Sequence, residues 1–128
     1  MTRLITTVLL IDDDPHVRDS VRKMLESWKL LVVEAENGLG GLALFRAHKP
    51  SLVITDIMMP EMDGIETLRE LTAIDPQTKV IAMSGGGGAK YADPLARAME
   101  LGAVATLEKP FRRQQLRTAV AQVLGREV

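Results

Sequence analysis

Five short apolar runs, separated by segments with helical spacing, constrain the fold of this chain more than any other feature of its sequence. The runs cover residues 6–11, 30–35, 51–55, 79–83 and 103–107. Each run is about one strand long and contains β-branched residues. Strands that alternate with helices pair in parallel, because each helix returns the chain to the start of the next strand. The sequence therefore predicts an α/β protein with a doubly wound, five-stranded parallel sheet covered by helices on both faces.

The segments between and after these runs carry the helices. Helices are expected at residues 17–28, 39–48, 65–72, 93–100 and 116–124. The first, third and fifth show apolar residues at spacings of three and four, whereas the second and fourth are weaker patterns. Asp93-Pro94 would open the fourth helix, and Gly102 would follow its end. No linker, repeat or low-complexity tract interrupts the alternation, so we expect residues 1–128 to form one domain.

Composition excludes several classes of function. The formal net charge is −1, which argues against a surface built overall to bind nucleic acid or an anionic membrane. Five basic residues and only one acid follow position 108, a pattern that we interpret as a solvated helix face. The absence of cysteine excludes disulfides, thiolate zinc sites and cysteine nucleophiles. No apolar run is long enough to span a membrane and the N-terminus is not a secretory signal, so we expect a cytoplasmic protein.

Polar side chains that end the apolar runs are the candidates for a functional site, because ligands bind at the carboxyl edge of a parallel sheet. These candidates are Asp12-Asp13-Asp14, Asp56, Ser84 and Lys109, at the ends of the first, third, fourth and fifth runs. The second run offers no comparable cluster and suits an edge strand.

The acids at these ends predict a metal site. Asp14 precedes Pro15 and has a structural explanation, as the cap of the first helix. Asp12, Asp13 and Asp56 would converge at neighbouring strand ends, where their repulsion would raise at least one pKa or require a cation. Mg²⁺ prefers a small number of carboxylate oxygens, together with water and phosphate oxygens. Each acid alone would be interpreted as a loop cap, but together they indicate Mg²⁺.

The remaining candidates predict phosphoryl transfer. Asp56 can act as a nucleophile that forms an acyl phosphate. Lys109 can supply a mobile positive charge and the Ser84 hydroxyl a hydrogen bond, where charge accumulates on the phosphoryl oxygens. Taken singly, Ser84 would be a turn residue and Lys109 an exposed lysine at a strand end.

Four motifs in order resemble the receiver domain of two-component response regulators. They are VLLIDDDPHVR, LVITDIMMPEMDGIE, VIAMSG and EKPF, and the resemblance covers essentially the entire chain. It implies a flavodoxin-like sheet with strand order 2-1-3-4-5. It also implies that Asp56 is the phosphoacceptor, that Asp13 binds Mg²⁺ directly, and that Asp12 binds it through water. The backbone carbonyl of Met58 would be a further metal ligand.

The resemblance assigns roles to other positions as well. Ser84 and Lys109 would hold the phosphoryl oxygens, and Lys109-Pro110 would be a cis peptide. Residues 59–64 would shape the loop after the acceptor, with Gly64 at a tight backbone position. Two features depart from the family pattern: Thr106 replaces the usual aromatic residue, and four consecutive glycines follow Ser84. Any switch would then use Ser84, the following loop and repacking of the fourth helix.

The resemblance implies a signalling switch and not an enzyme with an external substrate. A histidine kinase or histidine phosphotransfer protein would phosphorylate Asp56, which would alter partner binding by the surface of the fourth helix, fifth strand and fifth helix. We expect an unknown downstream protein, no direct nucleic acid or membrane binding, and a homodimer as one allowed assembly. The chain would be a stand-alone receiver or, slightly less favoured, the receiver of a longer regulator.

Two alternative functions fit the sequence less well. An aspartate-nucleophile phosphatase or phosphotransferase would normally carry a second acid two residues after the nucleophile, where this chain has Met58. A nucleotide- or flavin-binding module would need a glycine-rich turn after the first strand. The GGGGAK stretch also lacks the spacing of a P-loop.

Overall fold

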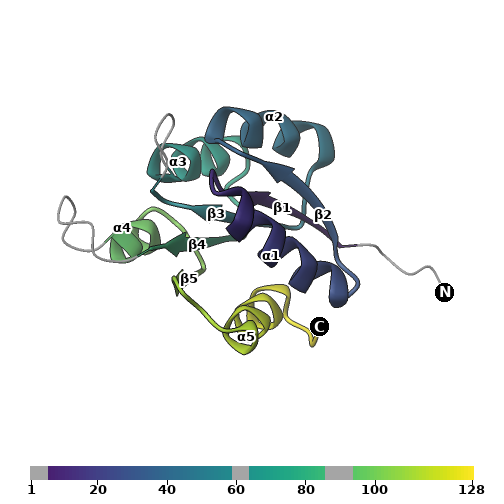
Figure 1. The fold of residues 1–128 in the computed structure, drawn as a ribbon. Coiled ribbons are helices and arrows are strands. Elements are labelled where there is room, and N and C mark those ends of the chain that lie inside the picture. Colours follow the sequence, from purple (N-terminus) through teal and green to yellow (C-terminus); the bar gives the residue numbers. More distant parts are fainter. Residues whose placement is uncertain (1–5, 59–63, 86–93) are drawn as a thin grey trace.

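The computed structural model describes residues 6–58, 64–85 and 94–128, which form alternating strands and helices (Figure 1). The strands are β1 (Thr7–Ile11), β2 (Leu31–Ala35), β3 (Leu52–Asp56), β4 (Val80–Ser84) and β5 (Ala105–Glu108). The helices are α1 (Pro15–Ser27), α2 (Gly38–His48), α3 (Gly64–Ile74), α4 (Pro94–Glu100) and α5 (Arg113–Leu124). Every expected element is present. Within the described ranges, no helix is long and apolar enough to cross a membrane.

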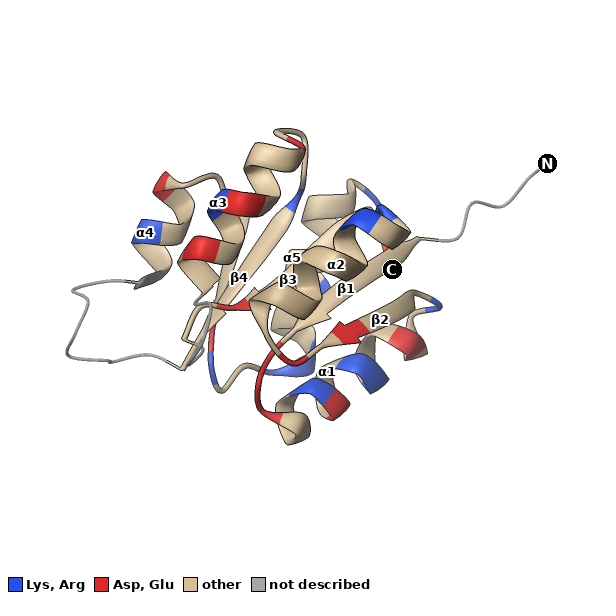
Figure 2. Cartoon of the chain, turned by 90° about the horizontal axis from the view of Figure 1, so that it is seen from above, with Lys and Arg blue, Asp and Glu red and all other residues tan. Residues whose placement is uncertain are grey.

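The strands form one parallel sheet with the order β2-β1-β3-β4-β5, which confirms both the expected order and β2 as an edge strand. The register pairs Ile11 of β1 with Thr55 of β3, and Asp56 of β3 with Met83 of β4. The carboxyl ends of β1, β3 and β4 therefore lie at one edge of the sheet. Figure 2 shows acidic residues at this edge, where the chain leaves β1 for α1.

Alternate residues of the strands supply two separate hydrophobic cores. Leu10 and Ile54 point to the face covered by α1 and α5, whereas Leu9 and Val53 point to the face covered by α2, α3 and α4 (Figure 1). The side chains of β3 and β4 are buried on both faces. This arrangement confirms the doubly wound sheet, because strands covered on both faces consist mainly of apolar residues, as β3 and β4 do before their polar ends.

Asp14 caps α1, as the sequence predicts. Its Oδ1 atom accepts hydrogen bonds from the backbone N–H of His16 at 2.9 Å and of Val17 at 3.4 Å, and Pro15 occupies the first turn. The hydrogen bond from His16 holds the pKa of Asp14 below its usual value. The third acid of the run therefore has a structural task in starting the helix.

The end of α4 agrees with the sequence-based expectation. The helix stops at Glu100, and Gly102 has a φ of 112°, a backbone conformation that side chains other than glycine rarely adopt. Asp93, the expected cap, lies outside the described residues.

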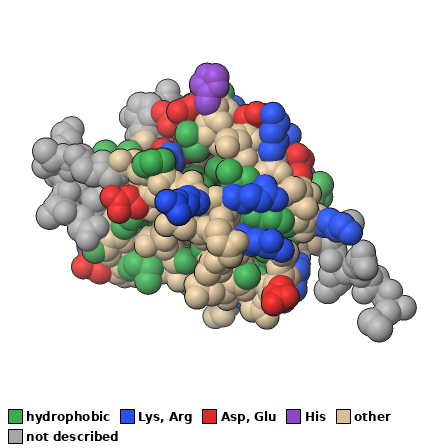
Figure 3. Space-filling model, turned by 60° about the horizontal axis from the view of Figure 1, so that its bottom comes forward, with side chains coloured by type: hydrophobic (Ala, Val, Ile, Leu, Met, Phe, Trp, Pro, Cys, Tyr) green, Lys and Arg blue, Asp and Glu red, His purple; other side chains and the backbone are tan. Residues whose placement is uncertain are grey.

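Basic side chains gather on the face that α1 and α5 share (Figure 3). The guanidinium carbons of Arg113 and Arg117 lie 5.1 and 6.0 Å from the centre of the Trp28 ring. Trp28 itself is largely buried in the core beneath α1 and α5. The basic face of α5 is therefore exposed, as expected, but two of its arginines also pack α5 against the end of α1.

Gly41 allows α2 to approach β1 directly behind the acidic run. A β-carbon at Gly41 would lie 2.4 Å from Cδ1 of the fully buried Ile11, whereas one at Gly40 would make only ordinary contacts. We expect Gly41→Ala to lower the free energy of unfolding by about 1–3 kcal/mol, the usual cost of overpacking a core. Gly40→Ala should be neutral or stabilising by up to about 1 kcal/mol, because alanine favours a helix. Chemical denaturation measures both variants, and equal effects would contradict the close approach.

Candidate functional site

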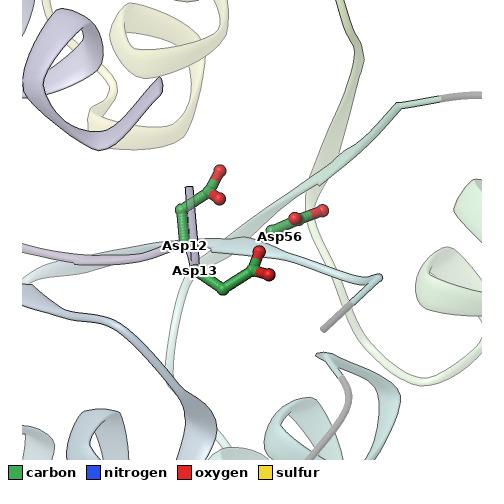
Figure 4. Close-up of side chains that lie close together, drawn as sticks. All are labelled: Asp12, Asp13 and Asp56. Carbon is green, nitrogen blue, oxygen red and sulfur yellow. The ribbon is translucent and has the colours of Figure 1, made fainter. Parts of the chain in front are cut away.

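The three acids predicted to bind a metal converge. Asp12 and Asp13 follow β1, and Asp56 is the last residue of β3. Figure 4 shows their side chains at neighbouring strand ends, and one carboxylate oxygen of each lies within 4.8 Å of the others. Such a set of hard oxygen donors fits Mg²⁺, which binds few carboxylates and completes its shell with water or phosphate.

Every polar group of Asp12 has a partner inside the protein. Its N–H donates to the carbonyl of Ala35 at 3.1 Å. Its Oδ1 accepts a hydrogen bond from the backbone N–H of Asp14 at 2.9 Å, and its Oδ2 accepts one from Nζ of Lys109 at 2.8 Å. The residue is fully buried, so these bonds offset the cost of removing a carboxylate from water.

The Asp56 carboxylate is also nearly buried and is held by two contacts. Its Oδ1 accepts a hydrogen bond from the N–H of Met58 at 3.2 Å, and its Oδ2 lies 3.3 Å from Nζ of Lys109. Burial raises the pKa of Asp56 above its usual value, and the charge of Asp12 adds to this rise, while Lys109 and the Met58 N–H act in the opposite direction. The repulsion expected from the sequence is present, but burial has the larger effect.

Lys109 supplies the positive charge between the two buried acids. It follows β5, and its own N–H donates to the carbonyl of Ser84 at 2.7 Å. Burial alone would lower the pKa of Lys109, but the hydrogen bond to Asp12 and the charges of Asp56 and Asp12 outweigh it, so the pKa is raised and the ammonium group stays charged. The bond from Lys109 to Pro110 is cis, as the resemblance implies.

Asp13 differs from the other two acids in its surroundings. Its side chain is exposed, and within the described residues no hydrogen bond or ion pair holds its carboxylate. Its place near Asp12 and Asp56 therefore depends on the backbone that carries it.

Ser84 and Met58 lie at the same edge of the sheet. Ser84 ends β4 and is almost fully buried. Met58 is 41% exposed, and its backbone N–H points to Asp56. The contact from the Met58 N–H was not expected from the sequence, because a backbone hydrogen bond of this kind leaves no sequence pattern. The expected loop positions 59–63 and the glycines at 86–88 lie outside the described residues.

Arg18 is a contact of the site that the sequence analysis missed. Its Nη1 atom donates to the backbone carbonyl of Asp12 at 2.7 Å, and its Nε atom lies 3.4 Å from Oε1 of Glu34 on β2. An arginine one turn after the cap of an amphipathic helix looks like an ordinary polar residue. Its place as the last residue of the VLLIDDDPHVR motif is the signal that could have drawn attention to it.

Gly64 packs against the backbone of the candidate acceptor, as expected. A β-carbon there would lie 2.3 Å from the carbonyl oxygen of Asp56 and 2.3 Å from Cα of Ile57. The Gly64 N–H also donates to the Ile57 carbonyl at 2.8 Å. Because the obstructing atoms belong to the backbone, a side chain at this position must displace the end of β3.

We expect Gly64→Ala to lower the free energy of unfolding by about 3 kcal/mol, toward the upper end of the cost of inserting atoms into a packed site. Gly85→Ala is the matched control, because a β-carbon at Gly85 would meet no atom within 4 Å. Chemical denaturation compares the two variants. A Gly64→Ala protein as stable as Gly85→Ala would mean that the end of β3 tolerates displacement.

An apolar groove of about 460 Å³ adjoins the acids. It lies between α1 and the segment after β5, and Val17, Val21, Met24 and Phe111 supply its apolar walls. Lys109 lines the groove and also contacts the acids, so the groove and the acidic site share one side chain.

The chain is similar to known proteins in both sequence and structure. The family model described as "Response regulator receiver domain" matches residues 8–121. The chain is 35% identical over 124 residues to the probable C4-dicarboxylate response regulator DctR of Priestia megaterium, covering 95% of this chain and 53% of that protein. It is 32% identical over 117 residues to the chemotaxis protein CheY of Halobacterium salinarum, covering 91% of this chain and 95% of that protein.

The chain is also similar to a phosphotransferase in sequence and to a solved receiver domain in structure. The chain is 32% identical over 117 residues to sporulation initiation phosphotransferase F of Bacillus subtilis, with 91% of this chain and 92% of that protein covered. Among solved structures, a response regulator receiver domain protein from Clostridium thermocellum superposes with a TM-score of 0.86 at 30% identity, covering 94% of this chain and 95% of that one. The chain thus spans about half the length of DctR but nearly all of CheY and of phosphotransferase F.

Proposed function

The chain belongs to the response regulator receiver domain family, whose members are two-component signalling switches phosphorylated on an aspartate, and we propose that Asp56 is the phosphorylated residue here. The observation that carries this proposal is the position of Asp56. It ends β3, its Oδ2 lies 3.3 Å from Nζ of Lys109, and its carboxylate adjoins those of Asp12 and Asp13. Asp12 is also buried beside Lys109, but its exposed fraction is 0%, whereas Asp56 keeps an exposed fraction of 5% and is itself the last residue of its strand.

The reaction proposed for Asp56 is transfer from a phosphohistidine. A carboxylate oxygen of Asp56 forms a bond to phosphorus, and the bond between phosphorus and the histidine nitrogen breaks. The electron pair of the broken bond stays on the imidazole, which takes up a proton, and Asp56 becomes an acyl phosphate. Lys109 and the Ser84 hydroxyl would face the phosphoryl oxygens, where negative charge accumulates.

The acids would hold Mg²⁺ beside the acceptor. Asp13 and Asp56 would bind the ion directly, Asp12 through water, and the carbonyl of Met58 would add a further oxygen. The oxygen-rich cluster within 4.8 Å supports this assignment. When bound, Mg²⁺ would supply positive charge that offsets the repulsion between the acceptor and an incoming phosphoryl group.

The partner proposed for phosphorylation is a histidine kinase or a histidine phosphotransfer protein, in the cytoplasm. The apolar groove between α1 and the segment after β5 supports contact with a protein, because it offers the partly exposed side chains of Val17, Met24 and Phe111 beside Lys109. An external small-molecule substrate is not needed for this role, so the protein would act as a switch that assists its own phosphorylation and dephosphorylation.

The output is proposed to leave through the face of α4, β5 and α5, toward an unknown downstream protein or a second copy of the chain. Two large apolar side chains support this, since Met99 of α4 and Val104 before β5 are each about half exposed. Thr106, which pairs with Ala82 of β4, stands where the family usually has an aromatic residue. The conformational change on phosphorylation would therefore pass through Ser84 and α4. We further propose that residues 1–128 form one receiver domain, which the match over 8–121 supports.

The proposed metal site predicts stabilisation by Mg²⁺. The thermal midpoint of the wild-type protein should rise as the Mg²⁺ concentration passes the dissociation constant, because the ion binds the folded state. Asp13→Ala should abolish most of this rise. Asp14→Ala is the matched control: it removes the cap of α1 and lowers stability without metal, but it should keep the full rise with Mg²⁺. An undiminished rise in Asp13→Ala would remove Asp13 from the ligand set.

The proposed acceptor predicts the site of phosphorylation. Wild-type protein treated with a small acyl phosphate and Mg²⁺ should gain one phosphoryl group by intact mass, and the gain should disappear in alkali, as expected of an acyl phosphate. Asp56→Asn should not gain it, because the amide is not a nucleophile of the required kind. Asp75→Asn, an exposed acid remote from the site, should react like wild type. Phosphorylation of Asp56→Asn at the wild-type level would assign the acceptor elsewhere.

A further inference from the structure

We infer that Arg18 is a positioning residue for the metal site, which it serves by fixing the peptide that joins Asp12 to Asp13. The inference deepens the proposed function and rests on its assignment of Asp12 and Asp13 as Mg²⁺ ligands. Arg18 would not be a metal ligand itself. It acts on the backbone between two ligands.

The three carboxylates of the candidate metal site are held to unequal degrees. Asp12 accepts hydrogen bonds at both carboxylate oxygens, and Asp56 has the Met58 N–H and Lys109. Within the described residues, no corresponding contact is found for the carboxylate of Asp13. The direction of the Asp13 side chain is therefore set by its own backbone.

The side chain of Arg18 holds the backbone that carries Asp13. A peptide group is planar, so the orientation of the Asp12 carbonyl also sets the orientation of the Asp13 N–H and restricts where the Asp13 side chain projects. Nη1 of Arg18 donates to this carbonyl at 2.7 Å, a short hydrogen bond from a charged donor. No backbone hydrogen bond to the Asp12 carbonyl is found within the described residues, so Arg18 is its principal anchor.

Arg18 is itself held in place by an ion pair with Glu34. Its side chain is only 20% exposed, and Nε lies 3.4 Å from Glu34 on β2. The planar guanidinium group can serve both partners at once, which a lysine ammonium group at the end of a flexible chain cannot do with the same geometry. The acid of Glu34 also offsets the positive charge of Arg18, which would otherwise repel a metal ion nearby.

Arg22 provides a matched control within the same helix. It lies one turn further along α1, and its Nε atom is 3.2 Å from the other oxygen of Glu34. It also pairs with Asp19 and Glu26, but it has no contact with Asp12 or Asp13. Arg22 thus shares the ion-pair surroundings of Arg18 without the bond to the acidic run.

The test measures the dissociation constant for Mg²⁺ by calorimetry, together with the thermal midpoint without metal, in the full chain. Arg18→Gln should weaken Mg²⁺ binding by about 10-fold, the lower end of the effect of removing a partner that orients a ligand. Arg22→Gln should leave the dissociation constant within about 2-fold of wild type, although both substitutions lower the thermal midpoint. Arg18→Lys keeps the charge but has a single donor nitrogen in place of the planar guanidinium group, so its affinity should lie between those of wild type and Arg18→Gln.

Each other outcome overturns the inference in a distinguishable way. Equal dissociation constants in Arg18→Gln and wild type would reduce Arg18 to a contact that stabilises α1. Tighter binding in Arg18→Gln would show that its charge, and not its hydrogen bond, governs the site. If Arg18→Gln does not fold, wild-type Mg²⁺ affinity in Arg18→Lys would overturn the inference and leave the proposed metal site intact. Absence of Mg²⁺ binding in the wild type would overturn both the inference and the proposed metal site.

Discussion

The ammonium group of Lys109 between two buried carboxylates is the interaction on which the acidic edge of the sheet depends. Asp12 and Asp56 are removed from water, and a buried carboxylate is costly unless a cation or hydrogen-bond donors compensate it. Lys109 lies 97 residues from Asp12 in sequence, and it connects the end of β5 to the ends of β1 and β3. One side chain thus offsets part of the negative charge of the site and joins the ends of three strands.

Parallel pairing explains how these groups come together. Because all five strands run in one direction, their last residues share an edge, and the register places Asp56 beside the end of β4. Apolar side chains on both faces of β3 hold the strand rigidly, so Asp56 has little freedom to move away. The backbone contact between Gly64 and Asp56 extends this rigidity into the start of α3.

Charge balance at this edge gives the proposed switch a physical basis. The site contains more acids than cations, and burial already raises the pKa of Asp56. A phosphoryl group on Asp56 would add negative charge next to the ammonium group of Lys109. The backbone of Lys109 is hydrogen-bonded to Ser84, so a rearrangement of either residue would reach the ends of β4 and β5, next to the proposed output face.

The sequence by itself determined the α/β alternation, the edge position of β2, the cap at Asp14 and the identity of the strand-end acids, because these features depend on local periodicity and on where an apolar run stops. The strand order came from motif resemblance and not from periodicity. Only the tertiary structure decided that Lys109 contacts Asp12 as well as Asp56, and that Arg18 holds the Asp12 carbonyl. These contacts join residues on different elements or a side chain to a backbone atom, so their distances arise from packing and leave no pattern in the sequence.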